Sequence, residues 1–217
     1  METRSGNSDA AVDESSSSSS SSYPEEVQRF MRIPWCAKYL SPTTTATTTP
    51  GGRGDLVVRV HENRTVLSSW QNQFVGGTLN TPDTIAGWVD LFPAPGPPPH
   101  YRIDEFLSLI ALNEGMIGFP GSVHGGAAAL LLDEVTGMHV ASQRAPGQPP
   151  NKGYRTAYLK ATYLKPMPAP GVVLVRSRIV RVEGRKNYVE AQIEDERREA
   201  LVKGEVLYIA LKSDPKL

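Results

Sequence analysis

A glycine-rich turn that runs directly into an apolar segment constrains the fold of this chain more than any other feature. Gly125 and Gly126 stand before a run of alanine and leucine residues, and this pattern predicts a helix over residues 126–142. Because the segment is apolar on nearly every side, we expect the helix to be buried on nearly every side. The helix therefore has to pack against other elements of the chain.

Strand-like segments lie on both sides of this helix in the sequence. Residues 106–112 precede it. Four more strand candidates follow it, at residues 154–163, 172–182, 188–195 and 201–211. Gly184, with the basic pair after it, fits a hairpin turn between the second and third of these four. One buried helix followed by an antiparallel run of strands indicates the α+β class.

The chain of 217 residues divides into three parts. Residues 1–24 hold an unbroken serine run and almost nothing apolar, so we expect a disordered tail. Residues 25–100 form an N-terminal extension, and residues 101–213 form the main domain. Within the extension we expect a short helix over 25–40 that stops or kinks near Pro34, strands at 56–66 and 75–78, and a rigid proline-rich connector at 94–99.

The charge balance and the single cysteine narrow the choice of partner and compartment. Lys plus Arg and Asp plus Glu both number 23, so there is no electrostatic case for nucleic acid as the main partner. A lone cysteine, Cys36, excludes an intrachain disulfide and fits a reducing compartment. No apolar run approaches the roughly 20 residues of a membrane span, and the N-terminus lacks a secretory or mitochondrial leader pattern. We therefore expect a cytoplasmic protein without a membrane span.

Two consecutive carboxylates, Asp133 and Glu134, interrupt the apolar helix. Burying an ionised carboxylate without partners is costly, so their presence indicates either solvent access or function. An exposed edge of the helix would account for both acids equally well. Helical periodicity does not choose between the two acids.

The start of the helix supplies a second chemical feature. Its first-turn N–H groups have no internal partner and carry the positive end of the helix dipole, so they can receive an oxygen that becomes negative during a reaction. Gly125 and Asp133 are eight residues apart, which is about 12 Å along a helix. A carboxylate and an N–H donor that act on one carbonyl must both lie within about 3 Å of it. Two antiparallel copies of the helix can meet this requirement where one cannot, so a two-fold dimer follows if the groups cooperate.

These residues resemble a known family. The segment His124-Gly125-Gly126 followed by Asp133 is similar to the signature of hotdog-fold thioesterases of the phenylacetate-pathway type and of their animal acyl-coenzyme A thioesterase relatives. A second block, residues 156–166, resembles the family's strand that ends in a tyrosine, two residues and a proline. The resemblance covers residues 106–211, about half of the chain. It implies a long central helix wrapped by a curved antiparallel sheet, and protomers that pair as a homodimer or homotetramer.

The resemblance also implies a reaction and a role for individual residues. The reaction is the hydrolysis of acyl-coenzyme A to the free acid and thiol, with no metal or cofactor. Asp133 resembles the catalytic carboxylate, acting as general base or nucleophile, and Thr156 resembles the hydroxyl that positions the water or the acid. Gly125 resembles the backbone N–H donor to the thioester oxygen, and His124 the histidine before it, which we expect to orient the substrate or support the structure.

Three further residues are expected at the substrate: Gly126, Ser122 and Gly118. Gly118 departs from the family pattern, because some relatives place asparagine or glutamine at this position to contact the thioester carbonyl. Either Gly125 polarises the carbonyl alone, or Ser122 helps, or the activity is weaker.

Other interpretations of the same residues stay open. The substrate could be an acyl or polyketide chain on a carrier protein, or the protein could bind acyl thioesters without turnover, which Gly118 favours. A Ser/His/Asp hydrolase built on Ser122 and His124 is disfavoured because the chain has no G-x-S-x-G nucleophile elbow. Cys36, next to Trp35, indicates buried packing rather than a nucleophile.

Overall fold

The computed structural model describes residues 24–40, 56–67, 71–94, 102–143 and 153–211. The expected serine-rich tail, and nearly all of the proline-rich connector, lie outside these residues. Within the described ranges, no helix is both long and apolar enough to cross a membrane.

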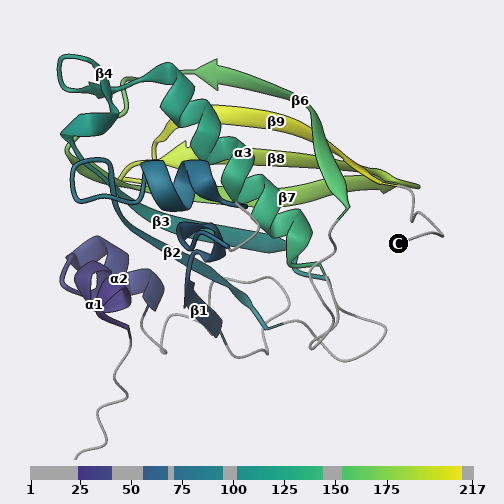
Figure 1. Ribbon diagram of the computed structural model, residues 1–217, viewed down its shortest axis with the longest axis horizontal. Helices are drawn as coiled ribbons and strands as arrows, with labels where there is room; N and C mark the ends of the chain where they lie inside the picture. The colour runs from purple at the N-terminus through teal and green to yellow at the C-terminus, as the bar shows by residue number, and fades with distance from the viewer. Residues whose placement is uncertain (1–23, 41–55, 68–70, 95–101, 144–152, 212–217) are drawn as a thin grey trace, which may run out of the picture.

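A seven-stranded antiparallel sheet forms the body of the protein (Figure 1). Its strands lie in the order β1-β2-β3-β7-β8-β9-β6. Their bounds are β1 Leu56–Val60, β2 Ile85–Pro93, β3 Glu105–Leu112, β6 Tyr154–Tyr163, β7 Gly171–Glu183, β8 Lys186–Glu194 and β9 Ala200–Ala210. A separate hairpin, β4 Ile117–Phe119 with β5 Ser122–Val123, stands just before the long helix.

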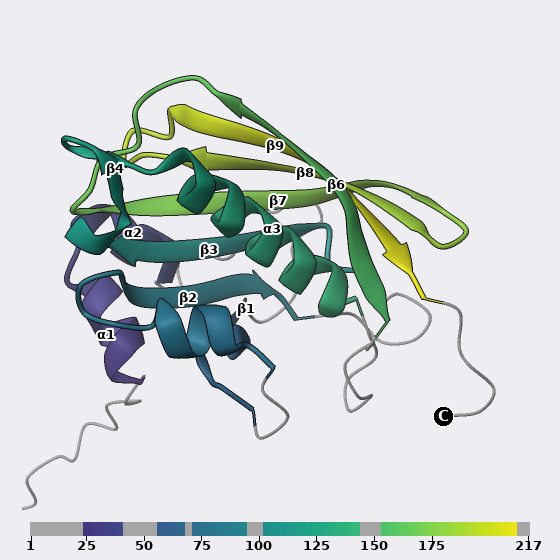
Figure 2. The same ribbon diagram turned by 45° about the horizontal axis from the view of Figure 1, so that its top comes forward.

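The long helix α3, Gly125–Ala141, lies across one face of the curved sheet, as Figures 1 and 2 show from two directions. Leu131, Leu132 and Val135 are fully buried and share one apolar core with Phe106 and Val173 of the sheet. Within α3 only Gly126 is exposed. A helix cradled by β3-β7-β8-β9-β6 is the hotdog arrangement, so the predicted α+β fold is confirmed.

Two short helices, α1 Glu25–Met31 and α2 Pro34–Leu40, cover part of the opposite face of the sheet. Val27 and Phe30 pack with Leu109 of β3 in a second apolar cluster. The predicted break near Pro34 is confirmed, because Pro34 is the first residue of α2 and its fixed φ suits a helix start. Cys36 is buried in this cluster, and burial raises the pKa of its thiol to about 12, so its predicted packing role is confirmed.

One part of the extension was predicted wrongly. Residues 75–78 belong not to a strand but to a short π-helix, η2 Gln73–Thr78. A Cβ on Gly76 would lie 2.8 Å from the Asn63 carbonyl oxygen, so this segment packs tightly on the 3₁₀ turn η1, Glu62–Arg64. That turn also ends the expected strand 56–66 at Val60. Within the seven-stranded sheet, the strand that the pattern did not predict is β2, which pairs with both β1 and β3 and joins the extension to the sheet. The short hairpin strands β4 and β5 were not predicted either.

Candidate active site

Asp133 lies halfway along α3, where two hydroxyl groups bind the same oxygen of its carboxylate. Thr156 Oγ1 of β6 donates to Asp133 Oδ1 at 2.9 Å. The Tyr208 hydroxyl of β9 lies 3.0 Å from the same Oδ1 and 2.7 Å from the Asp133 carbonyl oxygen. No described residue makes a hydrogen bond with Oδ2. One carboxylate oxygen is therefore held, and the other is available to a ligand.

The pairing of β6 with β9 explains why these two hydroxyls converge. Thr156 and Tyr208 are Cα partners in the antiparallel ladder, and paired side chains on one face lie close together. The ladder is irregular just after Thr156, at Tyr158. Gly137 of α3 lets the helix approach, because a Cβ there would lie only 3.3 Å from the Tyr208 hydroxyl. The site therefore depends on a close contact between α3 and β9.

Tyr208 is a candidate site residue that was not predicted from the sequence. Its burial, followed by the nearby Asp133 carboxylate, raises the pKa of its hydroxyl, so the group stays protonated and can donate a hydrogen bond. Thr136, one turn after Asp133 on α3, places its Oγ1 2.9 Å from the Tyr208 hydroxyl. The alternation of buried and exposed side chains along β9 could have pointed to this residue. Val202, Val206 and Tyr208 share the buried face, and a buried tyrosine hydroxyl needs a hydrogen-bond partner.

The start of α3 is capped by His124. Its Nδ1 accepts a hydrogen bond from the Gly126 N–H at 3.0 Å, and its carbonyl oxygen accepts from Ala127 and Ala128. The His124 side chain and carbonyl group therefore cap the start of α3. The Gly125 N–H has no hydrogen-bond acceptor among the described residues. Of the two glycines, Gly125 therefore offers the N–H that is free for an anionic oxygen, at the positive end of the helix dipole.

A tyrosine from the second motif block contacts Gly125. The Tyr163 hydroxyl, at the end of β6, donates to the Gly125 carbonyl oxygen at 2.8 Å. A Cβ on Gly125 would meet the same tyrosine ring at 3.5 Å. The family-like spacing pointed to Tyr163, but only the fold places its hydroxyl on Gly125.

The hairpin before the helix accounts for the glycine at position 118. A Cβ on Gly118 would lie 2.6 Å from both Cα and Cδ2 of His124, so no side chain fits there without displacing the cap. Ser122 lies across the hairpin from Phe119 and bridges to Pro168. The histidine therefore fills the space that a side chain at position 118 would occupy.

Glu134, the second carboxylate, faces a different part of the molecule. Its Oε2 accepts a hydrogen bond from Asn63 Nδ2 of η1 at 2.7 Å. Burial raises the pKa of Glu134, the Asn63 hydrogen bond and nearby His61 lower it, and Asp133 raises it. The fold thus separates two acids that helical periodicity left equivalent.

In the described part of the chain, no group of three or more His, Cys, Asp or Glu residues could hold a metal ion.

The fold and the site geometry define a hotdog protein with a carboxylate on the helix and a free N–H group at the helix start. Comparison with known proteins agrees with this class. Residues 120–202 match the model of the thioesterase superfamily. The match includes Gly125, Asp133 and Thr156, whereas Tyr208 and the whole extension lie outside it.

Individual relatives match over limited stretches. The mouse acyl-coenzyme A thioesterase THEM4 is 40% identical over 77 residues, which cover 36% of this chain and 30% of that protein. The rat protein of the same name is 36% identical over 101 residues, or 46% of this chain and 40% of that protein. A solved thioesterase superfamily structure is 30% identical with a TM-score of 0.43, covering 48% of this chain and 51% of the other. The chain thus spans less than half the length of the curated relatives that it matches.

Proposed function

We propose that this protein is an acyl-coenzyme A thioesterase. The observation that carries the proposal is the pair of hydroxyls on Asp133 Oδ1, with the Gly125 N–H free at the start of the same helix. The name of the mouse and rat relatives, acyl-coenzyme A thioesterase, supports the substrate class. Water supplies the second reactant, and the products are a free acid and the thiol of coenzyme A.

The proposed mechanism uses the two oxygens of Asp133 differently. Thr156 and Tyr208 hold Oδ1, so Oδ2 is directed at the bound water and removes its proton. The resulting hydroxide attacks the thioester carbon, and the carbonyl oxygen becomes negative. The Gly125 N–H of a second copy receives that charge. When the tetrahedral intermediate collapses, the C–S bond breaks and the proton on Asp133 passes to the leaving thiolate.

We propose that the site is shared by two copies of the chain. Within one α3 helix, Gly125 and Asp133 are about 12 Å apart, too far to act on one carbonyl. The edge strand β6 supports pairing, because its apolar side chains Tyr158 and Tyr163 are 47% and 54% exposed. A long exposed edge strand with apolar residues is prone to pair with another strand. Pairing of β6 with β6 of a second copy would extend the sheet and bring the two helices together.

Thiol release across a series of acyl-coenzyme A chain lengths tests this function. Wild-type protein should release coenzyme A with a preferred chain length, and Asp133→Asn should not. Acyl chains on a carrier protein, measured in parallel, distinguish the two thioester classes by kcat/KM. Binding of acyl-coenzyme A without release of thiol by the wild-type protein would contradict the proposed activity and leave a ligand-binding protein.

A further inference from the structure

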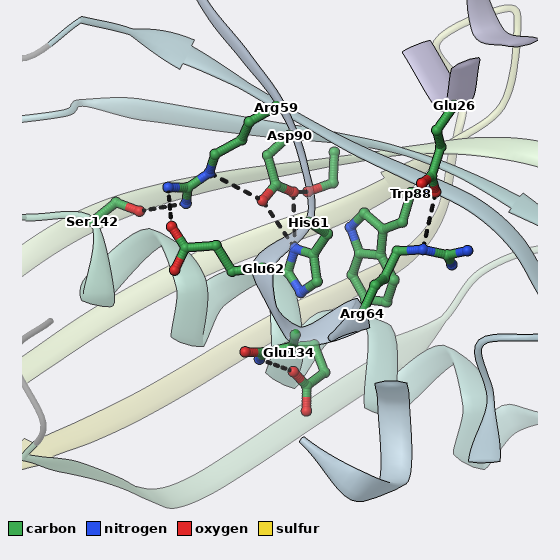
Figure 3. A network of polar contacts seen from close by, with 11 residues as sticks. Glu26, Arg59, His61, Glu62, Arg64, Trp88, Asp90, Glu134 and Ser142 are labelled. Carbon is green, nitrogen blue, oxygen red and sulfur yellow. Dashed lines mark hydrogen bonds and ion pairs between the residues drawn. The ribbon is translucent and has the colours of Figure 1, made fainter. Parts of the chain in front are cut away.

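A buried polar network joins the extension to the helix that carries Asp133 (Figure 3). Its centre is Asp90 of β2, which has no exposed surface. His61 Nδ1 lies 2.9 and 3.0 Å from the two carboxylate oxygens of Asp90, and Ser108 Oγ donates to Oδ1 at 2.7 Å. Arg59 Nε completes the group at 3.8 Å from Oδ2. Three side chains therefore fix this carboxylate, and the carboxylate fixes the His61 ring.

The orientation of His61 is further restricted by its neighbours. Its ring stacks on Trp88 with centroids 4.0 Å apart and planes 12° from parallel. Since a carboxylate accepts, Nδ1 is the donor to Asp90. The other ring nitrogen, Nε2, is buried and has no hydrogen-bond partner among the described residues. Figure 3 shows the ring between Asp90 and Glu134, with Nε2 on the Glu134 side.

The turn that begins at His61 carries the group that binds Glu134. The His61 N–H donates to the Trp88 carbonyl at 3.1 Å, which fixes the start of η1 against β2. From η1, Asn63 Nδ2 donates to Glu134 Oε2 at 2.7 Å. A second connection reaches the end of α3, where Arg59 Nη2 donates to Ser142 Oγ at 3.2 Å. The extension thus holds α3 at its middle and at its C-terminal cap.

The location of these residues matters for the reaction. Arg59, His61, Asn63 and Asp90 all precede residues 120–202, which match the thioesterase superfamily. Glu134 follows Asp133 directly, so the contact holds the helix turn that carries the proposed base. A displacement of about 1 Å at a reacting group can cost about 100-fold in rate.

We propose that the β1–η1–β2 unit fixes the position of the α3 turn that carries Asp133, with Asn63 and His61 as positioning residues. The catalytic consequence rests on the proposed function, whereas the restraint on α3 does not. Asn63 acts directly, through its hydrogen bond to Glu134. His61 acts through η1, because Asp90 and Trp88 hold it in one orientation.

Exchanging the two partners of the hydrogen bond tests the proposal. Asn63→Asp places a second carboxylate against Glu134, so the turn should loosen: kcat should fall about 10-fold while KM changes less than about twofold. The double variant Asn63→Asp/Glu134→Gln restores an amide–carboxylate pair with the roles reversed. The double variant should recover most of the lost kcat. If Asn63→Asp lowered kcat through a general structural defect, the second substitution would not recover it.

Hydrogen–deuterium exchange of the α3 amides around Asp133 provides a readout that does not depend on activity. Exchange should be faster in Asn63→Asp and return toward wild type in the double variant. The matched control is Asn113→Asp, because the Asn113 side chain donates to the Pro82 carbonyl and not to η1 or α3. Unchanged α3 exchange in Asn63→Asp, or equal changes in Asn113→Asp, would overturn the proposal. An inactive wild-type protein would refute the proposed function instead, and the exchange result would still decide whether the extension restrains α3.

Discussion

Two adjacent acids on α3 have opposite surroundings. Asp133 faces β6 and β9, is partly exposed, and binds hydroxyls through one oxygen only. Glu134 faces the extension, binds the Asn63 amide, and lies near the buried pair of His61 and Asp90. The first environment leaves an oxygen free for a reaction, whereas the second uses the carboxylate as an attachment point. The environment of each acid, and not its residue type, therefore separates the two roles, as for paired carboxylates in other enzymes.

The largest expected effect comes from removing the carboxylate of Asp133, with Glu134 as the comparison. Asp133→Asn should lower kcat by about 1,000-fold, because an amide cannot accept the proton from water. The substitution is nearly isosteric, so folding should be little affected. Glu134→Gln should lower kcat by less than about 10-fold, because it keeps an oxygen that can accept from Asn63. Initial rates on one acyl-coenzyme A measure both, and a larger loss in Glu134→Gln would reverse the assignment of the two acids.

The free energy of unfolding should depend strongly on the buried network of the extension. Asp90→Ala leaves the buried donors of His61 and Ser108 without an acceptor, so the free energy of unfolding should fall by about 4 kcal/mol. The matched control is Asp104→Ala, which breaks the exposed ion pair with Arg102 and should cost less than about 1 kcal/mol. Urea unfolding at one protein concentration measures both. Equal losses would mean that the buried network does not hold the extension to the sheet.

A pH-dependent stability is expected from the C-terminal half of α3. Burial lowers the pKa of His139 from 6.5 to about 4, while its ring nitrogens contact Ser177 Oγ and the Ile103 carbonyl. Between these values the unfolded chain binds a proton that the folded chain does not. Stability should therefore be complete above about pH 6.5 and fall by roughly 3 kcal/mol as the pH drops to about 4. His139→Gln should abolish this part of the slope, and an unchanged slope in that variant would contradict the assignment.

The smallest expected effect concerns the two hydroxyls on Asp133. Tyr208→Phe and Thr156→Ala each remove one donor to Oδ1, so each should lower kcat by about 10-fold with little change in KM. Tyr188→Phe is a suitable control, because Tyr188 stacks with Arg181 on β7 and β8, away from Asp133. A rise in KM at constant kcat would indicate that the hydroxyls bind substrate rather than orient the carboxylate.

The central helix and five strands of the sheet could be predicted from the sequence, because each of them has a local pattern of apolar residues. The apolar run of α3 and the alternation in β3, β6, β7, β8 and β9 are local patterns. Strand β2 was missed because Gly87 and the buried Asp90 interrupt its apolar character. Only the contacts with His61 and Ser108 explain an acid at that position. Residues 75–78 were misread because β-branched residues indicate a strand, while the close approach of Gly76 to η1 is a tertiary constraint.

The candidate site was predictable where it depends on one segment, and not where it depends on contacts between segments. The order His124-Gly125-Gly126 and Asp133 lies within one helix and its cap. By contrast, Tyr208 and Asn63 reach α3 from strands and turns more than 70 residues away. Helical periodicity could not separate Asp133 from Glu134, because the separation comes from which neighbour each acid meets.

Activity of mixed dimers tests the shared site most directly. Gly125→Pro removes the N–H at the first helical position, where proline is well tolerated, and Asp133→Asn removes the base. Each variant alone should be nearly inactive. Random 1:1 reassociation should restore roughly one quarter of the wild-type activity per chain, because half of the dimers are mixed and each mixed dimer has one complete site. If the mixture stays as inactive as its two components while mixed dimers are shown to form, the carboxylate and the N–H do not act across two copies.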